Sequence, residues 1–309
     1  MDKYTIRHFN QDFPDDAACL DFVVGLIYPD GVNCRTCGEV RPHHRLTNRK
    51  AYSCDYCGTH VYPLAGTVFE KSSTPLKSWF YAMYLISSTR CGISAKQLER
   101  ELGTTYKTAW RMFNQIRKLM GDDTGMLSGE VEIDESYIGG RERGIRGRPG
   151  RNSKKVPVFG IVERGGKVAA LVTKDVRRAT VMPIIQSKVL PKSLIYTDDY
   201  RIYNPLKASG YEHKRVAHSQ KVYVVGNIHT NTIEGFWSLL KRSISGVYHS
   251  VSAKYLQDYV NEFAFRYNHR SDRTPMFAII NQQARKVRHG RYGQYAPIGQ
   301  SKRPPCTAA

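Results

Sequence analysis

The chain has 309 residues, enough for about two or three domains, and its 47 lysines and arginines against 27 aspartates and glutamates give a net charge of +20. So strong a positive charge indicates a polyanionic partner, nucleic acid in preference to a membrane surface. The sequence contains neither an apolar run long enough to cross a bilayer nor an N-terminal secretory segment, which excludes a membrane-spanning or secreted class and predicts a cytoplasmic protein.

The first motif along the chain is a set of four cysteines. A short helix is predicted over 15–27, and after it Cys34 and Cys37 form one C-x2-C pair and Cys54 and Cys57 a second. Two such pairs supply the four thiolates of a tetrahedral Zn²⁺ site, and an all-cysteine site is structural rather than catalytic. Disulfide bonds are the alternative, which a cytoplasmic setting disfavours. We therefore predict a zinc ribbon.

Other cysteines and histidines surround this motif. His43, His44 and His60 could each replace a ligand, but four cysteines make this unnecessary. The remaining thiols have no partner at a ligand spacing, so we interpret them as plain thiols: Cys19, Cys91 and Cys306.

Residues 75–120 have the apolar periodicity of helices. The stretch "SAKQLERELG" ends at Gly103, and "TTYKTAWRMFNQIRKLM" follows at once. Two short helices joined through glycine, the second of them basic, indicate a helix-turn-helix. We expect the second helix to contact DNA, and packing within a helical bundle is the alternative. The candidate DNA contacts are Lys107, Arg111, Arg117 and Lys118.

The longest region, 128–270, alternates strand and helix signals. "GEVEIDESYIGG", "VPVFGIVERGG" and "KVAALVTKDV" are predicted strands, the last two joined by a hairpin at Gly165-Gly166. A helix, the strand "SLIYTDDY" and closing helices follow, which predicts a mixed α/β sheet with flanking helices.

A basic loop is predicted between the first two of these strands. Residues 141–155 contain seven arginines and lysines and one glutamate. A glycine-rich basic loop suits phosphate contact, because such contacts release counterions without a fixed geometry. A merely solvated loop is the alternative. The candidate contacts are Arg146, Arg148 and Arg151.

Three acidic residues of this basic region are candidate metal ligands. Asp134 lies within the first strand, Asp198 ends the strand "SLIYT", and Glu234 follows with 35 residues between. Carboxylates that converge form a hard-oxygen site for Mg²⁺ or Mn²⁺. Two such ions can stabilise the attacking and leaving oxygens of a phosphodiester displacement. Ordinary surface charges are the alternative.

The stretch "NTIEGFWSLLKR" (231–242) has a second interpretation, as the start of a helix. Asn231 is a candidate N-cap, and Glu234 three residues later could close a capping box. The apolar positions Ile233, Phe236 and Trp237 form a core stripe, which makes Trp237 a core residue rather than a base-stacking one. Glu234 can therefore be a cap, a catalyst or both.

The motifs "VEIDESYIGG", "IYTDDY", "HTNTIEGFWSLLKR", "GVYHSVS" and "NEFAFRYNHR" resemble, in order and content, the bacterial DDE-type insertion-sequence transposases with an N-terminal zinc ribbon, the ISXO-like group. The resemblance covers roughly residues 10–285. It implies a ribonuclease-H-like catalytic domain and a metal-dependent transposase in the bacterial cytoplasm, associated with the nucleoid. Its partners would be double-stranded transposon-end and target DNA, bound by a homodimer or higher oligomer.

The resemblance also implies roles for individual residues. The family's three acids fall on Asp134, which would bridge two Mg²⁺ or Mn²⁺ ions, and on Asp198 and Glu234, which would each hold one. Lys241 matches the lysine that would reach a phosphate of the bound end, a solvated lysine being the alternative. Four neighbouring residues bear on this assignment. Glu135 and Asp199 adjoin the matched acids, although strand alternation points Asp134 and Glu135 to opposite faces, and His218 and His229 could act as a general base.

The predicted organisation has four parts: an N-terminal helix with the zinc ribbon (1–70), a helix-turn-helix segment (71–122), a ribonuclease-H-like catalytic domain (123–289) and a basic flexible tail (290–309). Two other functions are compatible with these motifs. A structure-specific nuclease on the same fold would cleave DNA but not join it, and a non-enzymatic zinc-ribbon regulator would show no Mg²⁺-dependent cleavage.

Overall fold

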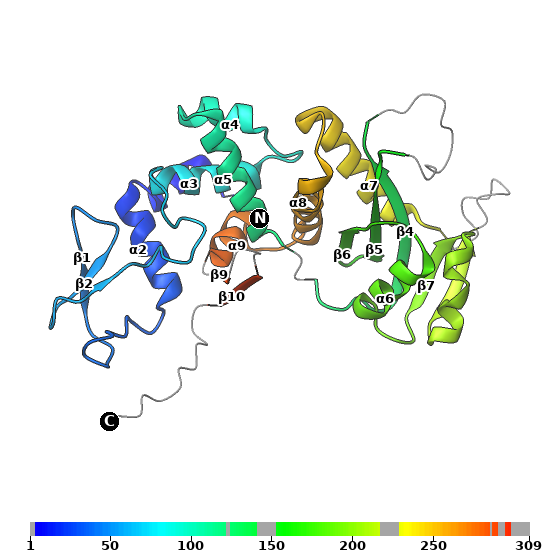
Figure 1. The fold of residues 1–309 in the computed structure, drawn as a ribbon, viewed down its shortest axis with the longest axis horizontal. Coiled ribbons are helices and arrows are strands. Elements are labelled where there is room, and N and C mark those ends of the chain that lie inside the picture. The colour runs from blue at the N-terminus through cyan, green and yellow to red at the C-terminus, as the bar shows by residue number, and fades with distance from the viewer. Residues whose placement is uncertain are drawn as a thin grey trace. The chain divides into compact units, whose positions relative to one another are not determined.

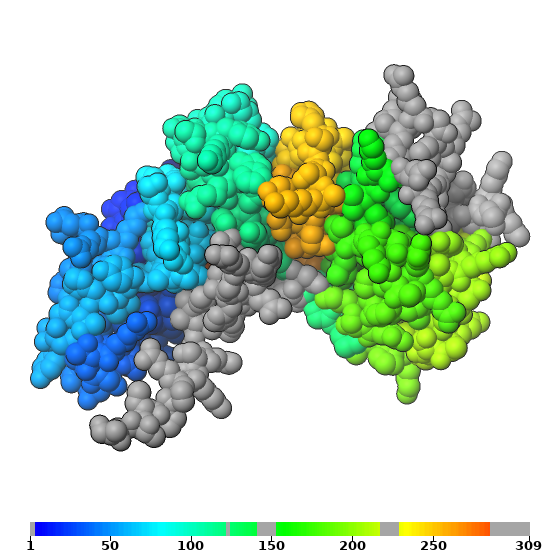
Figure 2. Space-filling view, viewed as in Figure 1, coloured from blue at the N-terminus to red at the C-terminus, as the bar shows by residue number. Residues whose placement is uncertain are grey.

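The computed structural model describes residues 4–121, 124–140, 153–216, 229–284, 286–289 and 294–297. The chain divides into two compact units (Figure 1). Unit 1 comprises Met1–Thr89, Ala95–Leu119 and Arg273–Ala309, and unit 2 comprises Arg90–Ser94 and Met120–Asp272. Figure 2 shows that side chains fill the spaces between the ribbons within each unit.

Unit 1 combines a small antiparallel sheet, of order β1-β2-β3, with helices. Aromatic side chains such as Phe9, Phe13 and Phe80 form its core. Its described elements are α1 (Ile6–Asp12), α2 (Asp16–Ile27), β1 (His43–Arg45), β2 (Tyr52–Cys54), β3 (His60–Val61), α3 (Leu76–Ser88), α4 (Ala95–Leu102), α5 (Tyr106–Leu119), α9 (Met276–Gln283), β9 (Lys286–His289) and β10 (Gln294–Pro297).

Helix α9 belongs to unit 1, although the sequence analysis assigned residues up to 289 to the catalytic domain. It packs against α3 and α5. Phe277 of α9 lies 5.9 Å from Phe9 and 5.8 Å from Phe13, measured between ring centroids. The apolar pattern of a helix indicates that it needs a core, but not which core receives it.

Two further features of unit 1 are the helix pair α4–α5 and the strand pair β9–β10. Helices α4 and α5 are joined by a short turn in which Gly103 has a φ of +60°, as the glycine link predicted. Within the predicted tail, residues 294–297 form β10, which pairs antiparallel with β9. Backbone pairing satisfies the N–H and C=O groups of such a segment, and composition alone does not reveal that pairing. The other residues of 290–309 lie outside the described part of the chain.

Unit 2 is built on a five-stranded sheet of order β6-β5-β4-β7-β8. Strands β4, β5 and β6 are antiparallel neighbours, whereas β7 runs parallel to β4 and β8 parallel to β7. The described elements are β4 (Glu130–Ile138), β5 (Val156–Glu163), β6 (Val168–Val172), α6 (Arg178–Lys188), β7 (Leu194–Asp198), η1 (Arg201–Ser209), β8 (Glu212–Val216), α7 (Asn231–Ser243), a π-helical turn η3 (Ile244–Tyr248), η4 (Ala253–Tyr255) and α8 (Leu256–Asn268).

Both faces of this sheet are covered (Figure 1). Val131 and Ile133 of β4 contribute to the core under α6 and η1, whereas Val158 and Val162 of β5 contribute to the core under α7 and α8. The period-two alternation of the strands sends neighbouring side chains to opposite cores. The predicted mixed sheet with flanking helices is confirmed, with β8 as a strand that the sequence analysis did not identify.

Gly160 of β5 is the point of closest approach between the sheet and α7. A Cβ built there would lie 2.6 Å from Cη2 of Trp237 and 2.9 Å from Cδ1 of Ile233, and it would also meet Cζ2 of Trp237. These atoms belong to the buried stripe of α7, so a side chain at Gly160 would push the helix from the sheet. Gly160 also pairs with Asp134 on the neighbouring strand.

We expect Gly160→Ala to destabilise the protein by about 1–3 kcal/mol, because the added methyl group overpacks this contact. Denaturant unfolding followed by tryptophan fluorescence measures the change. Gly235→Ala is the matched control. Gly235 lies in α7, the helix that Gly160 contacts, and a Cβ built there has nothing within 4 Å. Alanine at this position should therefore be neutral or stabilise the protein by up to about 1 kcal/mol. Equal stabilities of the two variants would contradict this account of the packing.

Candidate functional site

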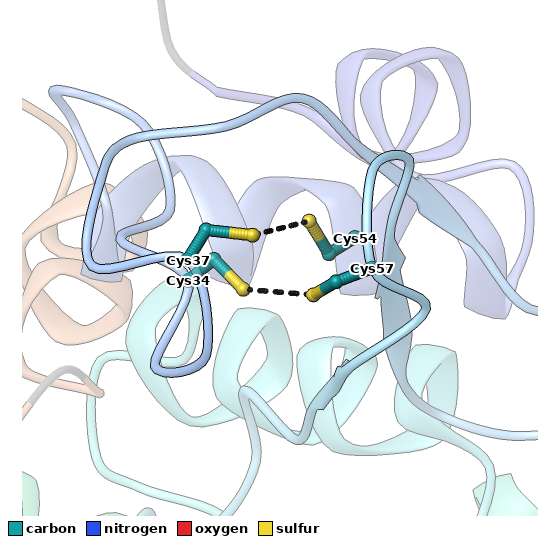
Figure 3. Close-up of side chains that lie close together, drawn as sticks. All are labelled: Cys34, Cys37, Cys54 and Cys57. Atoms are coloured by element: carbon teal, nitrogen blue, oxygen red, sulfur yellow. Dashed lines mark hydrogen bonds between the residues drawn. The ribbon is translucent and has the colours of Figure 1, made fainter.

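The four cysteines of unit 1 converge on one point (Figure 3). Their Sγ atoms all lie within 4.8 Å of one another, and the Cys34–Cys57 and Cys37–Cys54 pairs are 3.4 and 4.0 Å apart. Both cysteine turns have the same local cause. A glycine with positive φ follows each C-x2-C pair and donates its N–H to the carbonyl of the first cysteine of that pair. These glycines are Gly38, with a φ of +76°, and Gly58, with a φ of +72°.

Two thiols in this cluster have strongly perturbed pKa values. Hydrogen bonds with Thr59 lower the pKa of Cys57 to about 6, whereas the neighbouring sulfurs, Cys57 first, raise the pKa of Cys37 to about 12. Four thiols this close resist losing all their protons unless a cation offsets the charge. The arrangement therefore has the ligand chemistry of a closed tetrahedral zinc site.

The alternative ligands do not join this group. In the part of the chain that the structure describes, the four cysteines are the only cluster of three or more potential ligands within 4.8 Å. His43 bonds through Nδ1 to the carbonyl of Arg41, and His44 contacts Asp55. The prediction of an all-cysteine ligand set is consistent with this geometry.

In unit 2, Asp134 and Asp198 lie on neighbouring parallel strands. Glu132 of β4 pairs with Tyr196 of β7, and the two aspartates each follow two residues later. Since side chains repeat every second residue of a strand, both aspartates belong to the face that α7 covers. The N–H of Tyr200 donates to Oδ1 of Asp198 at 3.0 Å, which orients this carboxylate at the end of β7.

Glu234 lies exposed in the first turn of α7. The predicted capping box is wrong: the N-cap is Thr230 rather than Asn231, and no side-chain cap bond is made there. Glu234 instead accepts a hydrogen bond from Oγ1 of Thr230 at 3.0 Å. The question of whether Glu234 caps the helix is thereby answered, because its carboxylate does not hold the free N–H groups of the first turn.

The carboxylate that holds these N–H groups is Glu132, which the sequence analysis did not single out. Its Oε2 accepts from the N–H groups of Thr232 and Ile233 at 2.9 and 3.0 Å, and its Oε1 accepts from Oγ1 of Thr232 at 2.9 Å. Nε of Arg164 donates to Oε1 at 2.8 Å. Alternation within "VEIDES" places Glu132 on the same face as Asp134, but only the fold shows α7 there.

Asp134 has the most perturbed carboxyl of this region. Burial raises its pKa to about 7, and the charges of Asp198 and Glu234 act in the same direction. The hydrogen bond from Trp237 and the positive charge of Lys241 lower it. All three predicted acids are thus close enough to interact electrostatically, together with the predicted lysine.

Trp237 is a core residue, as predicted, and it also has a polar contact that the sequence did not reveal. It is 4% exposed and packs with Phe236 and Ile233. Its Nε1 donates to Oδ2 of Asp134 at 3.0 Å. A buried indole N–H needs an acceptor, and here that acceptor is the first candidate metal ligand.

Strand geometry separates Glu135 from the adjoining Asp134. Glu135 accepts from the hydroxyl of Tyr203 at 2.8 Å, and Tyr203 belongs to the core on the other side of the sheet. The prediction that Asp134 and Glu135 face opposite ways is confirmed. The carboxylates of Asp134, Asp198 and Glu234 do not form a cluster within 4.8 Å among the described residues, so the structure brings them near one another without joining them.

Lys241 is exposed two turns after Glu234, beside a cleft of about 410 Å³. Lys155 and His249 line the same cleft, with Tyr137 and Ile244 among its apolar walls. His249 has a φ of +60° and follows the π-helical turn η3. Strained residues and π-helical turns of this kind occur often at functional positions.

The basic residues predicted on the second helix of the helix-turn-helix, α5, differ in accessibility. Lys107 is exposed, whereas Arg111 lies over the ring of Trp79 and donates to Ser72, and Lys118 is half-buried. Arg117 is 2% exposed and lies over Phe113, so its predicted DNA contact is wrong: a guanidinium packed in the core cannot reach a phosphate.

The remaining candidates lie outside the described residues or have another partner. Arg146, Arg148 and Arg151 of the basic loop, and His218, are outside the described ranges. Nδ1 of His229 faces Arg164 and the N–H of Asn231, at 3.2 and 3.4 Å, which places it in the group of contacts around Glu132.

Comparison with known proteins identifies the chain. Residues 126–268 match the family described as the ISXO2-like transposase domain, and residues 14–60 match the transposase zinc-ribbon domain. An uncharacterized transposase-like protein of Haemophilus influenzae is 32% identical over 116 residues, which are 38% of this chain and 92% of that protein. The chain belongs to the ISXO2-like transposase family. This transposase is also 29% identical to an uncharacterized protein in transposable element ISH50 of Halobacterium salinarum. The aligned 273 residues are 82% of the transposase and 91% of the relative.

Solved structures add nothing to this conclusion. The Mos1 strand transfer complex aligns with 66% of the transposase and 74% of its own chain, at 11% identity and a TM-score of 0.29, which is too low to bear on fold or function. No helix in the described part of the transposase is long and apolar enough to span a membrane.

We expect the transposase to contain about one zinc ion per chain, and Cys34→Ser/Cys54→Ser to lose it together with the fold of β1–β3, because each cysteine turn loses one thiolate. Elemental analysis of the purified protein measures the metal. Cys91→Ser is the control, since Cys91 is an exposed thiol outside the cluster. A native protein without zinc would show that the cysteine cluster has another role.

Proposed function

We propose that this transposase cleaves and joins DNA strands with Mg²⁺ or Mn²⁺ held by Asp134, Asp198 and Glu234. The observation that carries the proposal is the parallel pairing of β4 with β7, which sets Asp134 and Asp198 at equivalent positions of adjacent strands. Glu234 lies near enough for its charge to raise the pKa of Asp134.

The donor set fits a hard divalent cation. Three carboxylates supply oxygen ligands, which Mg²⁺ and Mn²⁺ prefer over nitrogen or sulfur. The raised pKa of Asp134 expresses the cost of burying negative charges together, a cost that a bound cation would offset. When bound there, such ions lower the pKa of a nucleophilic water or hydroxyl and stabilise the charge on the leaving oxygen.

The residues of the chain divide the remaining work. Trp237 orients the carboxylate of Asp134 through Nε1, and the N–H of Tyr200 orients that of Asp198. Lys241 would neutralise a backbone phosphate beside the acids, and the cleft next to it, with Lys155 and His249, offers a positively charged path for the strand. Hydrolysis uses water as the nucleophile, and strand joining uses a 3′-hydroxyl.

The partner of this site would be double-stranded DNA, first the transposon ends and then the target. The net charge of +20 supports a polyanion, and exposed Lys107 on α5 remains a proposed contact of the helix-turn-helix. Lys118 and Arg111, both half-buried, remain further proposed contacts. Assembly as a homodimer or higher oligomer on DNA remains a prediction.

We expect Asp134→Asn and Glu234→Gln to abolish Mg²⁺-dependent cleavage of DNA carrying the element's own ends, while DNA binding survives, because each removes a ligand charge and little volume. Gel analysis of nicked and joined products, beside a binding assay, measures both. Glu135→Gln is the matched control on the opposite face of β4 and should keep activity. Full cleavage by either ligand variant would refute the assignment, and cleavage without joined product would identify a nuclease instead.

We expect Lys241→Ala to weaken binding of end DNA and to reduce the slope of log affinity against log salt by about 1, because one phosphate contact is lost. Binding titrations at several salt concentrations measure the slope. Lys207→Ala removes another exposed lysine, from η1, and should leave the slope unchanged. If the two variants behave alike, Lys241 is a solvated lysine.

A further inference from the structure

Strand β4 contacts helix α7 at two points that are two residues apart on the strand. Glu132 accepts the N–H groups of Thr232 and Ile233, and Asp134 accepts Nε1 of Trp237. Two strand residues span about 6.7 Å. The step from the first helix contact to Trp237 is four to five residues, which also spans about 6.8 Å along a helix. The strand and the helix therefore match in spacing, so both contacts can be made without distortion.

The first of these contacts is built as a charged helix cap supplied by another element. The first N–H groups of a helix have no partner within the helix and carry its partial positive charge, so a carboxylate is the favoured acceptor. Glu132 is fully buried, which makes its charge costly unless it is compensated. Its three bonds from Thr232 and Ile233, and the bond from Arg164, satisfy both carboxylate oxygens.

Arg164 is itself held in place. It donates to Glu130 at 2.8 Å and to the carbonyl of His229 at 2.8 Å, and it lies 4.0 Å from the ring centroid of Tyr196. The His229 carbonyl belongs to the chain just before α7. One arginine thus links β4, β7 and the approach to the helix.

We propose that Glu132 is a positioning residue: it caps α7 from the strand that carries Asp134 and so sets the place of Glu234 relative to that aspartate. The inference rests on the proposed function in one respect, that Glu234 is a metal ligand. Because Glu132 accepts from the free N–H groups in the first turn of α7, the carboxylate of Glu234 is not needed as their acceptor. Among the described residues, this carboxylate accepts a hydrogen bond from the Thr230 hydroxyl, a partner that a cation can share.

The test compares Glu132→Gln with Glu130→Gln in the full chain. Each variant removes the charge of one carboxylate that is paired with Arg164. Glu130, however, is exposed and has no bond to α7. Hydrogen exchange of the Thr232 and Ile233 amides reports the cap, and Mn²⁺ titration followed by electron paramagnetic resonance reports the acids. Thermal unfolding and zinc content show whether each variant is folded.

We expect Glu132→Gln to speed exchange of the Thr232 and Ile233 amides at least tenfold and to weaken Mn²⁺ binding by about 10–100-fold at temperatures where it is folded, with Glu130→Gln close to the native protein on both counts. A purely structural role would lower the melting temperature and leave the Mn²⁺ affinity of the folded protein unchanged, which would overturn the proposal. If Glu132→Gln does not fold, Thr232→Val removes a single bond to Oε1 and should show the same two changes at smaller size.

Asp134→Asn separates this inference from the proposed function. If the native protein binds Mn²⁺ and Asp134→Asn abolishes that binding, native-like binding by Glu132→Gln overturns the positioning role alone. If the native protein binds no Mn²⁺, or Asp134→Asn binds it normally, the proposed site and the positioning role both fail. Unchanged exchange at Thr232 and Ile233 would overturn the cap itself.

Discussion

The first turn of α7 has backbone N–H groups that need an acceptor, and the acceptor is a buried carboxylate on β4. This contact joins the central strand of unit 2 to the helix that carries Glu234. Gly160 and Trp237 form a second contact between the sheet and α7. Because Gly160 of β5 has no side chain, the indole of Trp237 can lie against the sheet and donate to Asp134. The helix is held at both points by groups on the same face of the sheet, and the acids of the candidate site depend on that placement.

Each unit gathers groups of like charge, thiols in unit 1 and carboxylates in unit 2. In unit 1, two C-x2-C-G turns gather four thiols, and hydrogen bonds lower the pKa of Cys57, through Thr59, and raise that of Cys37, through the neighbouring sulfurs. In unit 2, carboxylates from β4, β7 and α7 approach one another, and the pKa of Asp134 rises. Four sulfur atoms from two turns can enclose a cation, whereas the three proposed oxygen ligands, from separate elements, would leave coordination positions open to a substrate. The first arrangement stabilises a small domain, and the second suits chemistry on phosphodiesters.

Much of the molecule could be read from the sequence because its patterns are local. The cysteine spacing, the hairpin at Gly165-Gly166 and the alternation that separates Asp134 from Glu135 each depend on a few neighbouring residues. Membership in the ISXO2-like transposase family also followed from short ordered motifs. The capping box failed for a physical reason: Asn231 and Glu234 have the right residue types, but a carboxylate from a distant strand occupies the N–H groups they would have used.

The sequence by itself determined the zinc ribbon, the order of strands and helices through most of unit 2, and the identity of the candidate acids. Only the tertiary structure decided that Glu132 caps α7, that Arg117 is buried, that α9 joins unit 1 and that Trp237 bonds to Asp134. Each of these four features either brings together residues that are far apart in the chain or buries a polar side chain. Periodicity states which face of an element is apolar, but the partner of that face depends on how the elements pack.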